Sequence, residues 1–182
     1  MTTATGSGDV DADSSGAPGS TVTSDLAKVE QRAREVPGFR LFTVLAWDDE
    51  RGALHRVHSS AADAYPLGGE KVMPRDAPWI VQVVANRRPY LGRDAAAVAV
   101  VFSDHALIAS LGCGAVVNLP VVNGDRTLGV LSLLDAEGAY DEASVASALP
   151  LAAMAVPALL SWYDSCRTAA DARPASPMGP HP

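Results

Sequence analysis

The 182-residue chain is long enough for one ordinary domain with tails, and a second enzyme-sized domain does not fit. Hydrophobic residues make up 48% and charged residues 19%, enough apolar side chains for a core, so the chain is not disordered throughout. Fourteen Lys and Arg against 21 Asp and Glu give a net charge of −7, which is the wrong sign for a nucleic-acid partner or an anionic membrane surface.

The two ends of the chain have the composition of tails. Residues 1–24 are rich in Gly, Ser, Thr and Asp and predict a disordered segment that lacks the features of a signal peptide. From Asp164 the chain carries four prolines, which predicts a second disordered, Pro-rich tail over 164–182. The folded domain is therefore expected over 25–163.

The first half of this domain predicts a helix and then a β-hairpin. Apolar residues recur at helical spacing from Leu26 to Ala33, and Pro37-Gly38 ends the pattern. We therefore expect a helix over 25–36. Two antiparallel strands follow, over residues 39–47 and 54–59, and the stretch 61–75 is irregular.

The second half predicts short helices and a second hairpin. Asp76 and Pro78 are typical of a helix start, and this helix is expected to end near Asn86. Asn123-Gly124-Asp125 is a turn between two strands. The remaining expected elements are an edge strand at 89–91, helices at 95–101 and 104–111, and strands at 115–122 and 127–134.

An uncharged stretch over 143–163 is long enough to cross a membrane. Its composition, mostly Ala with several Ser, makes its transfer energy weak, and no Lys or Arg cluster flanks it closely. We therefore expect no membrane association and a buried helix, capped by Asp141 and Glu142. Pro150 and Pro157 are expected to kink or restart it.

Together the elements predict an α+β fold, with a single antiparallel sheet covered by helices on both faces. The block Gly112–Leu134, with its Asn-Leu-Pro strand, Gly-containing turn and Leu-Gly-Val-Leu-Ser-Leu return strand, resembles the final hairpin of GAF domains. Residues Arg87–Leu91 are similar to the family's usual exit from a helix into a short strand. In the order of its elements the resemblance covers about residues 26–162.

The resemblance implies a pocket on one face of the sheet, roofed by the central helices, for a cyclic nucleotide, a bilin, a haem or a metabolite. The family's cyclic-nucleotide motif has no counterpart here, and the one cysteine inside the domain does not support the reductase chemistry of some members. We expect no cofactor. The first interpretation is a stand-alone sensor or regulatory domain that binds a small molecule and has no output domain of its own. The alternative is a small metabolic enzyme using Asp104, His105, Cys113 and Asn118 in the pocket.

Ligand contacts are expected from the roof over 102–113, from the last two strands and from the wall of the pocket. The residues expected there are Tyr65, Trp79, Phe102, Asp104, His105, Cys113, Asn118 and Ser132. Several of them have a structural interpretation beside the functional one: Asp104 caps a helix, His105 is a surface residue, Cys113 is a small buried side chain, and Trp79 belongs to the core. Asn118 shares a face with Ser132 if the turn has three residues, whereas a two-residue turn changes the parity.

No metal site is expected. His55 and His58 lie three residues apart on a strand and should point to opposite faces of the sheet. Cys113 and Cys166 are far apart and indicate no disulfide, which is typical of a reducing, cytoplasmic compartment. The helices at 25–36 and 141–162 are expected to pack together on the face away from the pocket, where an apolar surface favours a homodimer.

Overall fold

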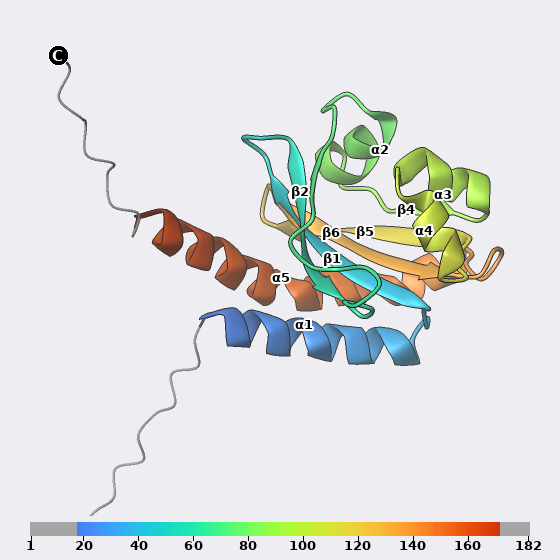
Figure 1. Cartoon of the computed structure of the whole chain (residues 1–182), viewed down its shortest axis with the longest axis horizontal. Helices are drawn as coiled ribbons and strands as arrows, with labels where there is room; N and C mark the ends of the chain where they lie inside the picture. Colours follow the sequence, from blue (N-terminus) through green and yellow to red (C-terminus); the bar gives the residue numbers. More distant parts are fainter. Residues whose placement is uncertain (1–17, 172–182) are drawn as a thin grey trace, which may run out of the picture.

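The computed structural model describes residues 18–171, which form one six-stranded antiparallel sheet with helices on both faces (Figure 1). The strand order is β3-β2-β1-β6-β5-β4. The predicted α+β architecture is therefore confirmed. The predictions of disorder for residues 1–17 and 172–182 lie outside the described residues.

The elements follow the predicted order, with one strand and one π-helical turn added. The strands are β1 (Leu41–Asp48), β2 (Ala53–Ser59), β3 (Glu70–Val72), β4 (Tyr90–Gly92), β5 (Ala115–Asn123) and β6 (Arg126–Asp135). The helices are α1 (Pro18–Glu35), α2 (Pro78–Ile80) with its π-helical continuation η1 (Val81–Ala85), α3 (Ala95–Val101), α4 (His105–Ser110) and α5 (Glu142–Asp171).

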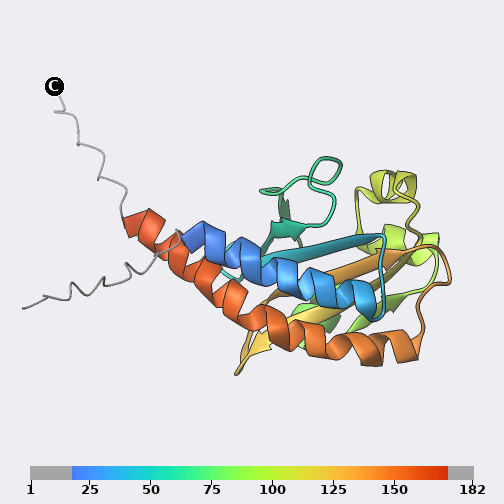
Figure 2. The ribbon, with the colours of Figure 1, turned by 90° about the horizontal axis from the view of Figure 1, so that it is seen from below.

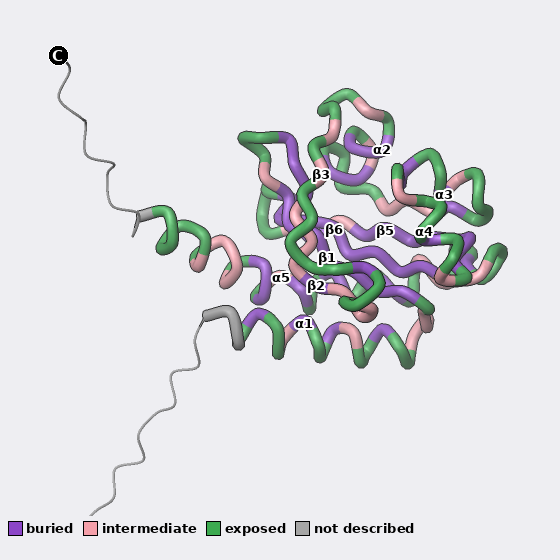
Figure 3. Tube along the Cα trace, in the orientation of Figure 1, coloured by how far each residue is buried: buried purple, intermediate pink, exposed green. Residues whose placement is uncertain are grey.

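One face of the sheet is covered by α1 and α5, which lie side by side as expected (Figure 2). Successive residues of a strand point to opposite faces, so alternate positions of β1, β5 and β6 enter this layer. Figure 3 shows the resulting pattern: the central strands are buried along their length, whereas the helices are buried on one side only. The largest fully buried side chains of the layer are Leu26, Phe42, Leu119, Leu128, Leu131, Leu133, Leu151 and Leu159.

The opposite face is roofed by short elements, namely α2 with η1, α3 and α4 (Figure 1). Their buried residues, among them Ile80, Val98 and Ile108, pack against the other side of the sheet. The first of these helices begins at Pro78 with Ala77 at its N-cap, so Asp76 does not cap it. The roof elements are short, so this second core layer leaves room for a cavity.

Both terminal helices are longer than expected. Helix α1 begins at Pro18 because Val22 continues the apolar spacing one turn before Leu26, and Val22 is only 6% exposed. Helix α5 continues to Asp171, eight residues beyond the expected end of the domain at residue 163. The boundaries expected at 24/25 and 163/164 therefore fall inside helices.

Helix α5 runs through both prolines without restarting. A proline removes its own N–H and leaves the carbonyl four residues earlier without its helical partner. Pro150 and Pro157 lie on the exposed side of α5, as do Ala146 and Ala153, so water can bond these two carbonyls. By length and composition, Glu142–Ala170 could cross a membrane. In this fold one face of the helix is buried against β5 and β6.

A β-bulge in β2 changes the direction of its side chains. Leu45 pairs with Arg56 and Val44 pairs with His58, so Val57 is an extra residue in β2. Arg56 faces the roof, whereas His58 faces α1 and lies 2.7 Å from Glu30. His55 also lies on the helix side, 5.9 Å from the ring of Trp162 in α5. The expectation that the two histidines occupy opposite faces is therefore wrong, because simple alternation does not survive the bulge.

The β5–β6 hairpin combines a two-residue turn with a bulge. Asn123 pairs with Arg126 across the turn, and the register shifts by one residue between Val121 and Val122. The bulge restores the parity that the two-residue turn alone would have changed. As a result Asn118 stands directly opposite Ser132, and both point to the roof side.

Candidate functional site

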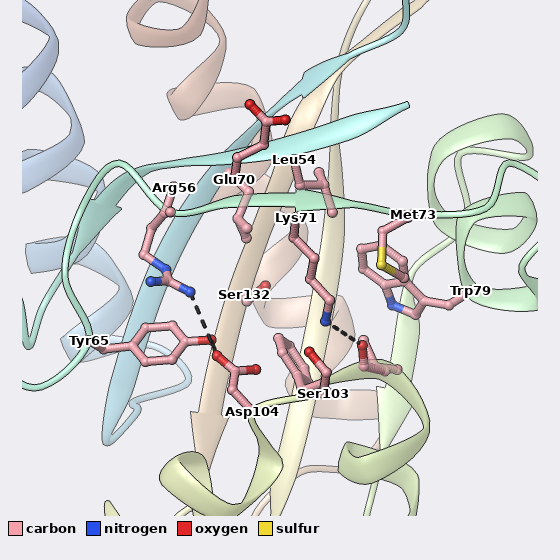
Figure 4. Close-up of a pocket in the computed structure, with 14 residues that line it drawn as sticks. Leu54, Arg56, Tyr65, Glu70, Lys71, Met73, Trp79, Ser103, Asp104 and Ser132 are labelled. Atoms are coloured by element: carbon pink, nitrogen blue, oxygen red, sulfur yellow. Dashed lines mark hydrogen bonds and ion pairs between the residues drawn. The ribbon is translucent and has the colours of Figure 1, made fainter. Parts of the chain in front are cut away.

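A cavity of about 190 Å³ lies between the sheet and the roof. Its walls come from strands β1, β2, β3 and β6, the loop that carries Tyr65, helix α2, and the turn between α3 and α4. In Figure 4, Arg56, Tyr65 and Asp104 lie together on one side of the cavity. Met73 and Trp79 lie on the other side, and the Lys71 side chain extends between the two groups. The cavity therefore has a polar half and an apolar half.

The polar half is built around the carboxylate of Asp104. The Tyr65 hydroxyl donates a hydrogen bond of 2.6 Å to Asp104 Oδ2, and Arg56 Nη2 lies 3.8 Å from the same oxygen. The Arg56 guanidinium stacks 3.5 Å above the Tyr65 ring and donates through Nη1 to the carbonyl oxygen of Pro66. Burial, together with the bond to Asp104, raises the pKa of Tyr65 well above its usual value. Tyr65 is therefore a neutral hydrogen-bond donor at physiological pH.

Lys71 extends from the edge strand β3 across the cavity. Its ammonium donates to the carbonyl oxygen of Val101 at 3.0 Å and lies 5.4 Å from the centre of the Phe102 ring. Burial lowers the pKa of Lys71, the Asp104 carboxylate opposes this shift, and the nearby Arg56 adds to it. The cavity thus holds a partly desolvated ammonium that a negative charge would stabilise.

The apolar half is held in place by a chain of buried hydrogen bonds. Trp79 Nε1 donates to Asn118 Oδ1 at 3.0 Å, and Asn118 Nδ2 donates to Ser132 Oγ at 2.7 Å. Asn118 and Ser132 are both fully buried. These bonds fix the indole of Trp79 as a wall of the cavity beside Leu45, Leu54 and Met73.

Five of the eight residues expected from the sequence line this cavity: Tyr65, Trp79, Phe102, Asp104 and Ser132. Asn118 lies behind the lining and holds Trp79. His105 is exposed on α4, with Nδ1 3.0 Å from the carbonyl oxygen of Phe102. Cys113 is buried in the core, where burial raises the pKa of its thiol. The residues proposed for the enzyme alternative do not converge on one cavity.

Asp104 does occupy an N-cap position, that of α4, but its side chain makes no capping hydrogen bond. The carboxylate accepts the Tyr65 hydroxyl instead. The structural interpretation considered for this residue is therefore not the one observed.

Arg56 and Lys71, the two cations of the site, were not among the expected ligand contacts. Arg56 lies in the strand expected over 54–59, and Lys71 lies in the stretch 61–75 that was expected to be irregular. The sequence offers one indication of this site, a charged arginine within the strand expected over 54–59. The direction of the Arg56 side chain follows only from the bulge at Val57, which puts Arg56 and His58 on opposite faces of the sheet.

Within residues 18–171, no three His, Cys, Asp or Glu side chains lie close enough together to hold a metal ion. Over the same range both cysteines are free, Cys113 buried and Cys166 exposed.

Comparison with known proteins identifies the fold. Residues 26–159 match the family model of the GAF domain. No curated protein matches the sequence.

Solved structures give the same answer at low identity. The cyanobacteriochrome receptor PixJ superposes with a TM-score of 0.61 at 18% identity, covering 79% of this chain and 97% of that chain. A fragment of a methyl-accepting chemotaxis protein superposes with a TM-score of 0.57 at 20% identity, covering 79% of this chain and 95% of that chain. The second GAF domain of DevS from Mycobacterium smegmatis superposes with a TM-score of 0.56 at 19% identity, covering 82% of this chain and 99% of that chain. The match of the family model over most of the chain shows that this protein belongs to the GAF domain family.

Proposed function

We propose that this protein is a sensor or regulatory GAF domain that binds a small molecule in the cavity between the sheet and the roof. GAF domains are ligand-binding sensor domains, and the similar structures include a chemotaxis protein and a light receptor. The observation that carries the proposal is a cavity between the sheet and the roof that is lined by partly buried charged groups, Arg56, Lys71 and Asp104. Charged side chains are costly to bury unless they are paired, which favours a role in binding.

Nothing in the arrangement favours the enzyme alternative. Its four residues are split between the cavity lining, the layer behind it, the surface and the core. A nucleophile and its base need to lie within hydrogen-bond reach of each other and of a common reacting atom.

The proposed output is a change in a homodimer formed through α5. The exposed side of α5 carries no charge between Glu142 and Asp164 and presents Leu149, Met154 and Leu160, which are 37–49% exposed. A signal from the cavity would reach this surface through β1 and β6, because their alternate side chains enter the cavity layer and the helix layer.

A fragment screen by NMR tests the proposed function. Ser103 is exposed at the rim and lines the cavity, so Ser103→Trp fills the cavity without altering the core. The matched control is Ser110→Trp, at an exposed position of α4 outside the cavity. We expect fragments that shift the resonances of the lining residues and lose binding in Ser103→Trp but not in Ser110→Trp.

Two results would overturn the proposal. The first is that fragments bind equally well to the Ser103→Trp protein. The second is chemical conversion of a bound compound, which would make the domain an enzyme.

A further inference from the structure

This inference rests on the proposed function and specifies the ligand: we propose that the cavity takes a small monoanion, a carboxylate with an apolar body. The argument uses the charges, the free donors and the size of the cavity.

The charges in the cavity do not cancel. Four charged residues contribute to its walls, namely Arg56, Glu70, Lys71 and Asp104. Glu70 does not act on the interior, because its carboxylate accepts a hydrogen bond of 2.8 Å from Arg51 and points away from Lys71 (Figure 4). Two cations then face one carboxylate, which leaves one positive charge. A monoanion neutralises this charge, whereas a zwitterion, a neutral molecule or a cation does not.

The two cationic side chains that line the cavity keep unused hydrogen-bond donors. The Nε atom of Arg56 is buried and has no hydrogen-bond partner among the described residues. Lys71 uses one backbone carbonyl, and an ammonium has three protons to donate. Asp104, the only carboxylate facing the interior within the described residues, already accepts the Tyr65 hydroxyl. A ligand that supplies acceptors complements this set, and carboxylate oxygens form the stronger, charge-assisted bonds.

The rest of the lining is apolar. Leu45, Leu54, Met73 and Trp79 form the half away from Asp104, and the hydrogen bond to Asn118 holds the indole of Trp79 in place. A volume of about 190 Å³ is small, since a cavity of about 150 Å³ already accommodates benzene. The body of the ligand is therefore one ring or a short branched chain.

Benzoate is the probe that tests this inference, with benzamide and benzylamine as neutral and cationic compounds of the same shape. Titration of the complete chain, followed by NMR, should show benzoate bound in the cavity at least about tenfold more tightly than either, the factor expected from one charge-assisted hydrogen bond. Ser103→Trp should abolish this binding.

Two substitutions predict changes of opposite sign. Lys71→Met removes a cation while keeping a side chain of similar length. It should weaken benzoate binding about tenfold and leave the affinity for benzamide within about threefold of that of the parent protein. Asp104→Asn removes the opposing charge, keeps an acceptor for Tyr65, and should tighten benzoate binding. The matched control is Lys28→Met, an exposed lysine of α1 at the far face of the sheet, which should change the affinity for neither benzoate nor benzamide. Because loss of folding weakens binding in every variant, tighter binding in Asp104→Asn separates charge from stability.

Equal binding of benzamide or benzylamine, or no effect of Lys71→Met, would overturn the monoanion while leaving the proposed function standing. The same holds if benzoate fails to bind while neutral or cationic fragments occupy the cavity. If no fragment of any charge binds there, the proposed function falls as well.

Discussion

At the scale of single residues, the hydrogen bonds that join Trp79, Asn118 and Ser132 show how one buried polar side chain can hold a wall of the cavity in place. Asn118 accepts from the indole and donates to the serine hydroxyl, and all three residues are buried. Asn118→Ala should therefore destabilise the domain by about 2–4 kcal/mol, because two buried partners are left unsatisfied. Ser132→Ala should cost less, since the indole keeps its acceptor. Denaturant unfolding of both variants measures this order, and equal stability of Asn118→Ala and the parent protein would contradict it.

A second residue-scale prediction concerns alkaline pH. Burial raises the pKa values of both Tyr65 and Tyr140 above their ordinary value, and the Tyr140 hydroxyl also donates to the carbonyl oxygen of Gly38. The folded state therefore holds these protons more tightly than the unfolded chain. The stability that they contribute is complete below the unfolded pKa of about 10 and is lost as the pH rises above it, by about 1.4 kcal/mol per pH unit for each tyrosine.

Urea unfolding of the parent protein and of Tyr140→Phe between pH 8 and pH 11.5 measures this dependence. The free energy of unfolding of the variant should fall less steeply above pH 10, and the two curves should be parallel below pH 9, which serves as the internal control. Parallel curves over the whole range would show that Tyr140 titrates normally in the folded state.

At the scale of elements, Gly129 is what allows β6 to lie against β1. A Cβ at this position would overlap the carbonyl oxygen of Leu45 and lie 3.0 Å from Leu159 Cδ1 of α5. Gly129→Ala should therefore destabilise the domain by about 3 kcal/mol or more, the upper end for overpacking, because backbone cannot move aside as a side chain can.

The matched control is Gly124→Ala in the β5–β6 turn. Gly124 has φ +57°, and a Cβ there meets no atom within 4 Å. The cost should be about 1–2 kcal/mol, from the left-handed backbone alone. Thermal unfolding of both proteins should rank Gly129→Ala as the less stable, and the reverse order would show that the strands separate easily at this point.

The elements with a strong apolar pattern were predicted well. Strands β1, β5 and β6 were expected within a few residues of their bounds because each is an apolar run that ends at polar or Gly-containing turn residues, and helices α3 and α4 were expected equally closely. Strand β3 was missed, since three residues with two charges carry no period. The faces of β2 were also beyond prediction, because the bulge at Val57 leaves no mark in the composition of the strand.

The same reason explains which part of the candidate site was predictable. Tyr65, Trp79 and Asp104 were expected because they stand out in the segments that roof or flank the sheet. Arg56 and Lys71 were missed because the bulge and β3, which direct them inward, were missed. His105 and Cys113 were expected to contact the ligand only because they lie in the segment 102–113. In the structure His105 is exposed and Cys113 is buried in the core.

At the scale of the whole molecule, the sheet separates two surfaces. The cavity lies on one side, and the α1–α5 layer covers the other (Figure 2). Leu45 lines the cavity while its neighbours in β1, Val44 and Ala46, pack toward the helices. Under the proposed function, a shift of β1 caused by an occupied cavity would be transmitted to α5 through this close-packed layer.

The last prediction concerns the exposed side of α5. Residues three, four or seven apart share one face of a helix, so Ala146, Leu149, Ala153 and Leu160 form one uncharged stripe, and all four are exposed. A stripe of this kind is typical of a surface that another copy covers. We expect light scattering at micromolar concentration to give twice the chain mass of 18.8 kDa.

The double substitution Leu149→Glu and Leu160→Glu places two charges within this stripe and should convert the protein to a monomer. Its melting curve at low concentration should be unchanged, because neither side chain belongs to the core. Val100→Glu is the matched control: Val100 is 77% exposed on α3, at the opposite face of the sheet, so its substitution should leave the dimer intact. A monomeric mass for the parent protein would remove the dimer and with it the proposed route from cavity to output. A dimer that survives the double substitution would place the contact elsewhere than on α5.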